Sequence, residues 1–286
     1  MNLNAMARLM RLDKPIGIWL VLFPALWGVL MAHKGAPDMG VLLMMLAGAV
    51  VMRSAGCIIN DLTDRDLDGA VERTRHRPLI TGEVTKNQAY QLLAVLLGIA
   101  LILAAMLPRM VFLLGALALP LIVAYPWMKR ITWWPQLFLG VVFNFGALIG
   151  WAATGASLSG GAFFLYAACM AWTLGYDTIY AMQDAADDAV IGIRSTARRF
   201  AGHIPTFVAC CYSAMVVALL LAGTLASMGL MCLLGIIGVG LHLRWQGKAL
   251  QKDNAISRAG ALFISNQWLG VWLFFCLLMD RCYFSS

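Results

Sequence analysis

The chain has 286 residues, of which 62% are hydrophobic and only 12% are charged, and its formal net charge is +7. A soluble domain is closer to half apolar and a quarter charged, so this composition excludes an ordinary soluble protein and indicates an integral membrane protein. The positive charge is distributed as membrane topology requires, and we expect no nucleic-acid partner.

Apolar segments recur along almost the whole chain. A membrane-spanning helix needs about 20 predominantly apolar residues, and these runs are too long and continuous for the strands of a barrel. The fold class is therefore all-α: one polytopic transmembrane domain over residues 1–286, with about nine transmembrane helices around a central cavity. In chain order we predict these helices at residues 16–33, 39–59, 89–107, 110–125, 135–154, 161–183, 204–224, 227–245 and 259–279.

Lysine and arginine are unevenly divided between the two sides of this predicted bundle. With a cytoplasmic N-terminus, cytoplasmic segments hold 17 of the 21 basic residues, Arg53 lies inside a helix, and the other side holds only Lys34, Arg109 and Arg281. This is the positive-inside bias. The start of the chain is short and basic and the first helix is long enough to span, so we expect no cleavable signal. A bacterial inner (plasma) membrane fits best, and a trimmed organellar form is the alternative.

Acidic residues are concentrated after the second and the sixth predicted helix, at about 60–88 and 177–203. The first stretch reads N-D-x-x-D-x-x-x-D. Asn60, Asp64 and Asp68 therefore lie at i, i+4 and i+8, on one face of a helix.

The second stretch contains D-x-x-x-D, and we predict that one helical stripe is shared by Asp177, Tyr180, Asp184 and Asp188. Arginines follow the acids in both stretches. This similarity favours an internal repeat offset by four helices, with both acidic ends facing a shared cavity on the cytoplasmic side.

Carboxylates four residues apart repel each other, and partial desolvation at a membrane boundary worsens the repulsion. One compensation is an ordinary ion pair with the arginines that follow, Arg65, Arg73, Arg75 and Arg77. Two matched acidic stretches favour another: Mg²⁺, which typically joins one or two carboxylates to substrate phosphates. Since arginine binds phosphate oxygens bidentately, acids and arginines together indicate a site for a metal–diphosphate complex.

Such a site suits the departure of a diphosphate, because metal ions neutralise the charge that gathers on it. If the broken bond is allylic, the carbon fragment departs as a delocalised cation. A long isoprenoid would also account for the membrane, because its tail needs an apolar slot between helices while its head lies at the cytoplasmic edge.

Four segments resemble a known family: "RLDKPIGIWLVLFPALWG" (11–28), "NDLTDRDLDGAVERTRHRPL" (60–79), "YPWMKRITWWPQLFLG" (125–140) and "DTIYAMQDAADDAVIGIRSTA" (177–197). In this order, with nine helices, they are similar to the UbiA superfamily of intramembrane aromatic prenyltransferases over nearly the whole chain. "DKPIG", "YPWMKR" and "DTIYAMQD" look most like the branch that acts on 4-hydroxybenzoate in ubiquinone biosynthesis. Arg194 stands where the family pattern has lysine, and "RPLITG" where it has "RPLPSG".

The resemblance implies roles for individual residues. It implies catalytic roles for Asp64, Asp68, Asp177, Asp184 and Asp188. The implied magnesium ligands are Asn60, Asp61, Asp64, Asp68, Asp184 and Asp188. The candidates for binding diphosphate are Arg65, Arg73, Arg77, Lys129, Arg194 and Tyr180. Arg53 would bind the carboxylate of the aromatic acceptor.

Simpler explanations stay open for several of these residues. Asn60 can cap the C-terminal end of its helix, and Tyr180 can simply pack. Asp177 can orient an arginine, help to deprotonate the phenol, or form a structural ion pair with a base such as Arg53. Arg53 can instead pair with an acid of the first stretch, and the other basic candidates can serve membrane topology alone.

The activity that the resemblance implies is Mg²⁺-dependent transfer of a polyprenyl group from polyprenyl diphosphate to the 3-position of 4-hydroxybenzoate, within the lipid bilayer. The first alternative is another acceptor, namely homogentisate, dihydroxynaphthoate or a glycerol phosphate lipid. The second is a transporter of ions or organic anions, which would need charge near the bilayer midplane and broken helices from both halves. Prenyl length and oligomeric state stay open.

Overall fold

The structure, a computed structural model, describes residues 3–32, 35–68 and 74–283. Within these ranges every regular element is a helix, which confirms the all-α prediction. The helices are α1 (Leu3–Leu9), α2 (Ile16–Ala32), α3 (Met39–Asp68), α4 (Pro78–Thr81), α5 (Lys86–Ala105), α6 (Arg109–Ile131), α7 (Pro135–Phe143), α8 (Phe145–Ala153), α9 (Gly160–Ala181), α10 (Ala185–Val190), α11 (Thr196–Arg199), α12 (Ile204–Leu225), α13 (Leu230–Ala249) and α14 (Ala255–Tyr283).

Each apolar segment that was predicted to span the membrane is helical over most of its described length. Of the described helices, seven stretches are long and apolar enough to cross a membrane, and one of them, Pro135–Ala153, consists of α7 and α8 together. α2 is also apolar but shorter, with 17 residues, and α9 has 22 residues. The chain is therefore a multi-pass membrane protein.

The polar stretches after α3 and α9 contain more helix than the sequence predicted. α3 continues to Asp68, so that its last turns carry the first acidic motif beyond the predicted span. Pro78 opens the short α4, and Gly82 ends it with φ 80°, a left-handed conformation that glycine adopts without strain. Thr85 then starts α5 with a capping box, in which Thr85 and Gln88 satisfy each other's backbone N–H groups.

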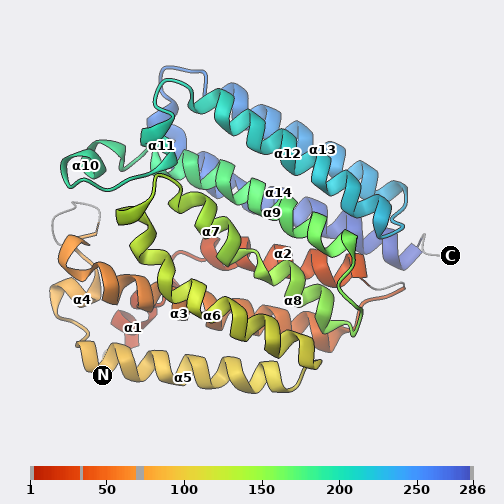
Figure 1. Cartoon of the computed structure of the whole chain (residues 1–286), viewed down its shortest axis with the longest axis horizontal. Coiled ribbons are helices and arrows are strands. Elements are labelled where there is room, and N and C mark those ends of the chain that lie inside the picture. Colours follow the sequence, from red (N-terminus) through yellow and green to blue (C-terminus); the bar gives the residue numbers. More distant parts are fainter. Residues whose placement is uncertain (1–2, 33–34, 69–73, 284–286) are drawn as a thin grey trace.

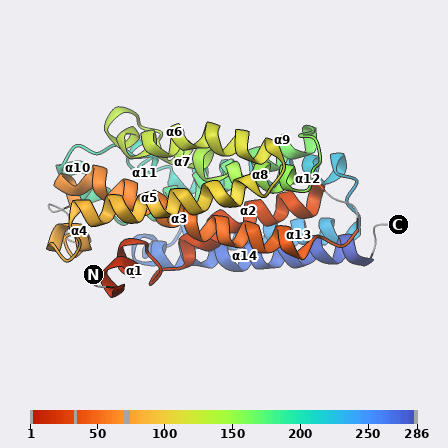
Figure 2. The ribbon, with the colours of Figure 1, turned by 90° about the horizontal axis from the view of Figure 1, so that it is seen from below.

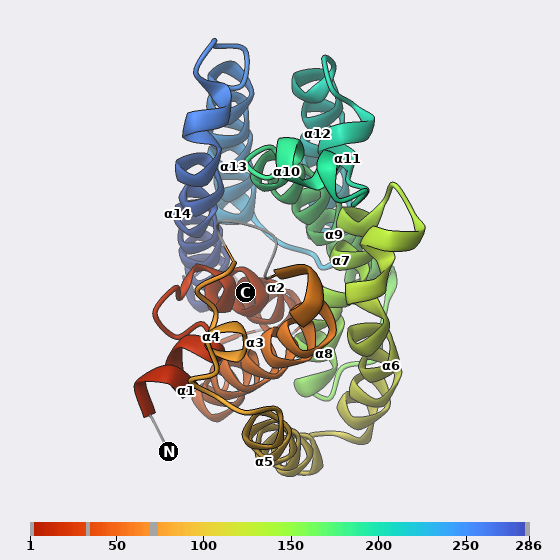
Figure 3. The same cartoon turned by 90° about the vertical axis from the view of Figure 1, so that its left-hand side faces the viewer.

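The long helices lie side by side along the longest axis of the molecule (Figure 1). α1, α4, α10 and α11 gather at one end, which we call the acidic end because α3 and α9 deliver their acidic stretches there (Figure 1). The C-terminus lies at the opposite end. α14 and α6 lie on opposite sides of the bundle (Figure 2). Seen from the acidic end, α2 lies inside the bundle (Figure 3), where it contacts α3, α8, α9 and α14.

α2 and α8 approach each other so closely that only glycine fits between them. A Cβ atom at Gly150 would lie 1.9 Å from the carbonyl oxygen of Ala25, and one at Gly28 would lie 2.2 Å from that of Ala147. Gly146 and Gly150 form a G-x-x-x-G pair on α8. Small residues at this spacing let two membrane helices pack backbone against backbone.

The segment predicted as one helix over 135–154 is interrupted at Asn144, between α7 and α8. Asn144 is fully buried, and its Nδ2 donates hydrogen bonds to Gly140 O at 2.7 Å and to Thr173 Oγ1 of α9 at 2.8 Å. The prediction of a continuous helix was wrong here, because the break is stabilised by a contact between two helices rather than by a local helix breaker.

Two buried charged residues fasten the helix ends at the end of the bundle opposite the acidic end. Arg281 donates three hydrogen bonds of 2.8–3.0 Å to carbonyl oxygens at the C-terminal ends of α2 and α12, those of Leu30, Met31 and Ala226. Asp280 accepts from backbone N–H groups at the start of α13, including that of Gly229 at 2.7 Å. Each charge lies where the helix dipole favours it, since carbonyl ends attract cations and N–H ends attract anions.

Replacing Arg281 by methionine is expected to lower the free energy of unfolding by about 3 kcal/mol. Three buried carbonyl groups would lose a charged donor, and Asp280 would remain buried beside them. The thermal midpoint of the detergent-solubilised protein measures the loss. Arg109→Met is the matched control, because Arg109 is exposed and is the first residue of α6, whose N-terminal end lies at this end of the bundle (Figure 1). Equal loss of stability in both variants would contradict this role for Arg281.

Candidate active site

A cavity of about 970 Å³ runs into the bundle from the acidic end, between walls that come from α1 to α9 and α14. Near the acidic end its wall carries charged and polar side chains, among them Asn60, Asp61 and Tyr180, and Arg53 and Asp177 lie deeper along α3 and α9. Farther along α3, α5 and α6 it is lined by apolar side chains such as Met44, Leu101, Val111 and Leu119. One cavity therefore combines a charged region with a long apolar slot.

Asp61 of the first acidic motif is buried, with 1% of its surface exposed, and is held by two arginines. Arg11 donates from Nη2 to both carboxylate oxygens at 3.0 Å, and Arg77 donates from Nη1 to Oδ1 at 2.9 Å. Arg11 belongs to the turn after α1, and Arg77 directly precedes α4. Asp61 therefore fastens the N-terminal segment and the first polar stretch to α3.

Asp64, one turn after Asn60 on α3, is fully buried and paired with the C-terminal end of α6. Its carboxylate accepts hydrogen bonds from Lys129 Nζ at 2.5 Å and from Arg130 Nη2 at 3.4 Å. The same end of α6 contacts the second polar stretch. Arg194 donates its backbone N–H to Lys129 O at 2.9 Å and its Nη1 to Ile131 O at 2.6 Å.

The C-terminal end of α6 thus links the two acidic stretches. Lys129 and Arg194, both predicted to bind diphosphate, lie next to each other there. Figure 1 places α10 and the C-terminal end of α3 at the same end of the molecule. Of the described residues in the two stretches, Asn60, Asp61, Asp177 and Tyr180 line the cavity, whereas Asp64, Asp184 and Asp188 are not part of its wall.

The sequence predicted one continuous helical stripe in the second acidic stretch, but the structure divides this stretch between two helices. α9 ends at Ala181, where the N–H groups of Met182 and Gln183 bond carbonyls only three residues back, at 3.2 Å each. Asp184 then precedes the separate helix α10, which carries Asp188. Asp177 and Tyr180 face the cavity from α9, whereas Asp184 and Asp188 are half-buried in the connection beyond it.

Arg53 of α3 lies inside the bundle, and its side chain forms part of the cavity wall. Its guanidinium lies 5.5 Å from the centre of the Phe143 ring and packs against the backbone of Gly17 in the first turn of α2. Tyr125 lines the same region, and Arg53 and Asp177 both act electrostatically on its hydroxyl group. Arg53, Asp177 and Tyr125 therefore form one polar group in the cavity.

The remaining predicted residues have other positions. Arg65 is exposed and donates from Nε to Leu79 O at 3.3 Å. Asp68 is the last residue of α3, but its side chain, like the whole of Arg73, lies outside the described part of the chain. Sequence reasoning did not single out Arg11 or Tyr125. Tyr125 stands first in "YPWMKR", so that segment already carried a signal for it, whereas nothing local points from Arg11 to Asp61.

Among the described side chains, no group of three His, Cys, Asp or Glu lies close enough to hold a metal ion. Mg²⁺ does not need such a cluster, because substrate phosphates and water usually complete its shell. Asn60 and Asp64 offer the oxygen donors that Mg²⁺ prefers, so these residues fit an ion bound together with a diphosphate. Lys129 contacts the Asp64 carboxylate, and it must turn away before that carboxylate can accept an ion.

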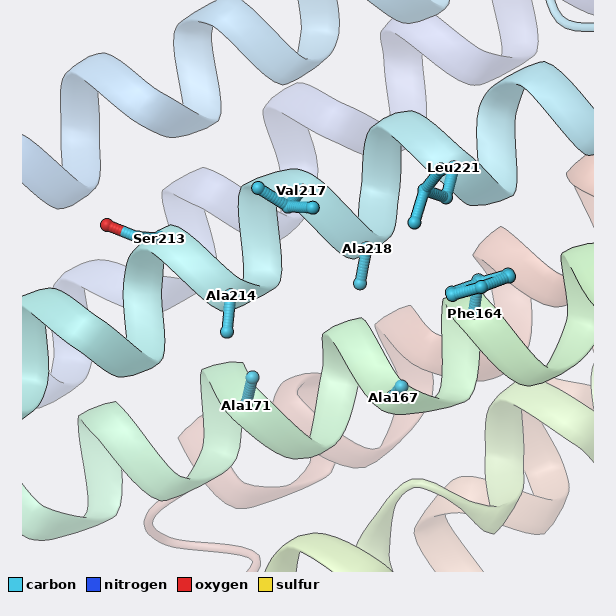
Figure 4. A pocket seen from close by; sticks show the side chains of 8 residues that line it. All are labelled: Phe164, Ala167, Ala171, Ser213, Ala214, Val217, Ala218 and Leu221. Atoms are coloured by element: carbon cyan, nitrogen blue, oxygen red, sulfur yellow. The ribbon is translucent and has the colours of Figure 1, made fainter.

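A second hollow, of about 430 Å³, lies between α9 and α12 (Figure 4). Its lining is apolar apart from one hydroxyl group: Phe164, Ala167, Ala171, Ser213, Ala214, Val217, Ala218 and Leu221. Because this lining has no charged side chain, the hollow does not suit a diphosphate.

Fold and site together define a class of protein: an all-helical, multi-pass membrane protein whose cavity is charged at one end and apolar along its length. The UbiA prenyltransferase family matches residues 21–277, and the chain belongs to this family. The resemblance of the four sequence segments is thereby confirmed.

Curated relatives extend over nearly the whole chain. A mitochondrial 4-hydroxybenzoate polyprenyltransferase from Aedes aegypti is 44% identical over 98% of this chain, which spans 64% of that relative's length. A 4-hydroxybenzoate octaprenyltransferase from Methylobacillus flagellatus is 42% identical over 100% of this chain and 96% of the relative.

Solved structures share the fold. A UbiA homolog from Aeropyrum pernix K1 has a TM-score of 0.80 at 24% identity, over 92% of this chain and 97% of that one. A UbiA homolog from Archaeoglobus fulgidus bound to GPP and Mg²⁺ has a TM-score of 0.70 at 17% identity, over 93% of this chain and 99% of the other. At these identities the likeness concerns the fold.

Proposed function

We propose that the chain transfers a polyprenyl group from polyprenyl diphosphate to the 3-position of 4-hydroxybenzoate, with Mg²⁺ as cofactor. The observation that carries this proposal is the cavity, which unites a charged end with an apolar slot. The relatives named for 4-hydroxybenzoate support the choice of acceptor. A transporter has less support, because most charged side chains gather at one end of the bundle and the chain belongs to a prenyltransferase family.

The diphosphate lies at the acidic end, and the prenyl tail lies in the apolar slot. Bound Mg²⁺ would draw charge off the diphosphate oxygens while the C1–O bond breaks. We assign its ligands to the two acidic stretches: Asn60, Asp64, Asp68, Asp184 and Asp188. Arg65, Arg73, Arg77, Lys129, Arg194 and Tyr180 are the assigned diphosphate partners.

Asp61 has a different assignment from the one that the sequence predicted. Both of its oxygens accept hydrogen bonds from Arg11, and one also accepts from Arg77. These three hydrogen bonds occupy the Asp61 carboxylate more fully than the two from Lys129 and Arg130 occupy that of Asp64. We therefore assign Asp61 to holding Arg77 beside the diphosphate.

The acceptor binds deeper, with its carboxylate at Arg53 and its phenol near Asp177. As the C1–O bond breaks, the diphosphate keeps the bonding electron pair and C1 becomes part of an allylic cation. The ring carbon ortho to the hydroxyl group bonds to C1, and the released diphosphate accepts the proton that this carbon loses as aromaticity is restored. Asp177 holds the phenol in this orientation, and the apolar walls exclude water that would otherwise quench the cation.

The acidic end faces the cytoplasm of a bacterium in this proposal, as the positive-inside bias requires. Relatives occur in bacteria and in mitochondria, and an organellar membrane would place the same end toward the matrix.

Removing divalent metal is expected to lower the rate of product formation about 100-fold or more, because the diphosphate then departs without charge compensation. Purified protein in detergent is incubated with labelled 4-hydroxybenzoate, polyprenyl diphosphate and Mg²⁺, with and without a chelator. Excess Mg²⁺ added after the chelator should restore the 3-polyprenyl product. A rate unaffected by the chelator would contradict the metal assignment.

The same assay decides between acceptors. Homogentisate, dihydroxynaphthoate and a glycerol phosphate lipid replace 4-hydroxybenzoate in parallel reactions. Turnover of one of these, with no product from 4-hydroxybenzoate, would replace the proposed acceptor while leaving the reaction class intact.

A further inference from the structure

Gly17 and Arg53 meet inside the cavity wall. Gly17 lies in the first turn of α2, and Arg53 reaches it from α3. A Cβ atom at position 17 would lie 2.3 Å from Arg53 Nε, 2.7 Å from Nη2 and 2.8 Å from Cζ. The guanidinium therefore occupies the space that a side chain at position 17 would need.

The position of the guanidinium is fixed by its neighbours, but one of its donors has no acceptor among the described residues. Among the described residues its buried Nε has no hydrogen-bond partner, while Arg53 as a whole is half-buried in the cavity wall. Phe143 covers another side of it, with its ring centre 5.5 Å away. A buried donor without an acceptor is costly, and a carboxylate that binds the guanidinium with paired hydrogen bonds would remove that cost.

We propose that Gly17 is a specificity-determining residue, which positions Arg53 to select acceptors that carry a carboxylate. This inference rests on the proposed function. Gly17 itself touches no substrate in this arrangement. It acts through Arg53, by letting the Nε edge pack against the α2 backbone while the guanidinium remains part of the cavity wall.

Alanine at position 17 separates this role from a structural one. The atoms that the new methyl group would meet belong to the flexible end of the arginine rather than to backbone, so the guanidinium must move by about 1 Å to reach an ordinary contact distance. Alanine also favours helix more than glycine does, so α2 is not weakened. A displacement of about 1 Å in a positioning group can cost about 100-fold in rate.

The test compares two acceptors of nearly the same shape, the anionic 4-hydroxybenzoate and the neutral 4-hydroxybenzamide, in which an NH2 donor replaces one carboxylate oxygen. In the Gly17→Ala variant, the ratio of kcat/KM for the acid to kcat/KM for the amide should fall at least about tenfold. The KM for polyprenyl diphosphate should stay within about twofold of the unmodified protein, because the diphosphate lies at the acidic end. General damage to the enzyme would instead lower kcat/KM for both acceptors alike and would also change the KM for polyprenyl diphosphate.

Two further variants make the result decisive. Gly240→Ala on α13 is the matched control, since a Cβ atom there meets nothing within 4 Å and Gly240 is not part of the cavity wall. Arg53→Met should lower the same acid-to-amide ratio, and adding Gly17→Ala to it should change the ratio no further, because both changes act through one guanidinium.

The outcomes distinguish this inference from the proposed function. If the unmodified protein prenylates 4-hydroxybenzoate but Gly17→Ala keeps the same acid-to-amide ratio, the inference is overturned and the function stands. Additive losses in the double variant would also overturn it. If the unmodified protein prenylates neither acceptor, the proposed function fails and the inference fails with it.

Discussion

Replacing Asp64 by alanine is expected to lower the turnover of polyprenyl transfer at least about 1,000-fold. Asp64 is fully buried on α3 and carries the negative charge between Lys129 and Arg130. Its removal takes away a proposed magnesium ligand and leaves two cations without their shared partner. The rate of 3-polyprenyl product formation at saturating substrates measures the effect.

The thermal midpoint must be recorded for the same sample, so that loss of turnover is not confused with loss of the fold. Asp253→Ala is the matched control, because Asp253 is an exposed acid in the connection between α13 and α14. We expect its turnover to stay within about twofold of the unmodified protein, as for most exposed substitutions. Near-normal turnover in Asp64→Ala would remove the basis for the metal site.

Replacing Gly150 by leucine is expected to destabilise the protein by at least about 3 kcal/mol, because the α2–α8 contact has no room for any side chain. The Cβ atom alone would lie 1.9 Å from the carbonyl oxygen of Ala25, and a backbone atom cannot turn aside as a flexible side chain can. The two helices must separate, and α2 also contacts α3, α9 and α14.

The yield of monodisperse protein on size-exclusion chromatography, together with its thermal midpoint, measures this loss. Gly240→Leu is the control for adding the same apolar side chain to a membrane helix, because open space surrounds a Cβ atom at Gly240. Normal yield and normal melting of Gly150→Leu would show that α2 and α8 can repack, contrary to this expectation.

The sequence predicted the membrane helices well because their signal is local. Twenty consecutive apolar residues have few alternatives to a spanning helix, and the positions of α3, α5, α6 and α12 follow from that alone. The sequence analysis did not predict the short helices α4 and α10. Their formation depends on chain reversals and on neighbouring segments, and not on a long apolar run. The break at Asn144 was missed for a related reason, since its partner Thr173 lies on another helix.

From the sequence, the candidate site could be predicted only where its acidic and basic residues lie on the same face of one helix. Asn60 and Asp64 lie one turn apart on α3, as their spacing predicted. Their partners were not predictable, because Arg11 meets Asp61 across 50 residues and Lys129 meets Asp64 across 65. Such pairs are set by how helices pack, and a single sequence carries no periodic signal for them.

The bonds of Asp280 and Arg281 determine where this molecule can move. They join the ends of α2, α12, α13 and α14 at the end of the bundle opposite the acidic end, and therefore hold these four helix ends together as a fixed hinge. We expect any widening that admits a bulky substrate or releases a product to occur at the acidic end, which these bonds do not reach. Substrates would then enter, and products leave, on the side on which the acidic stretches lie.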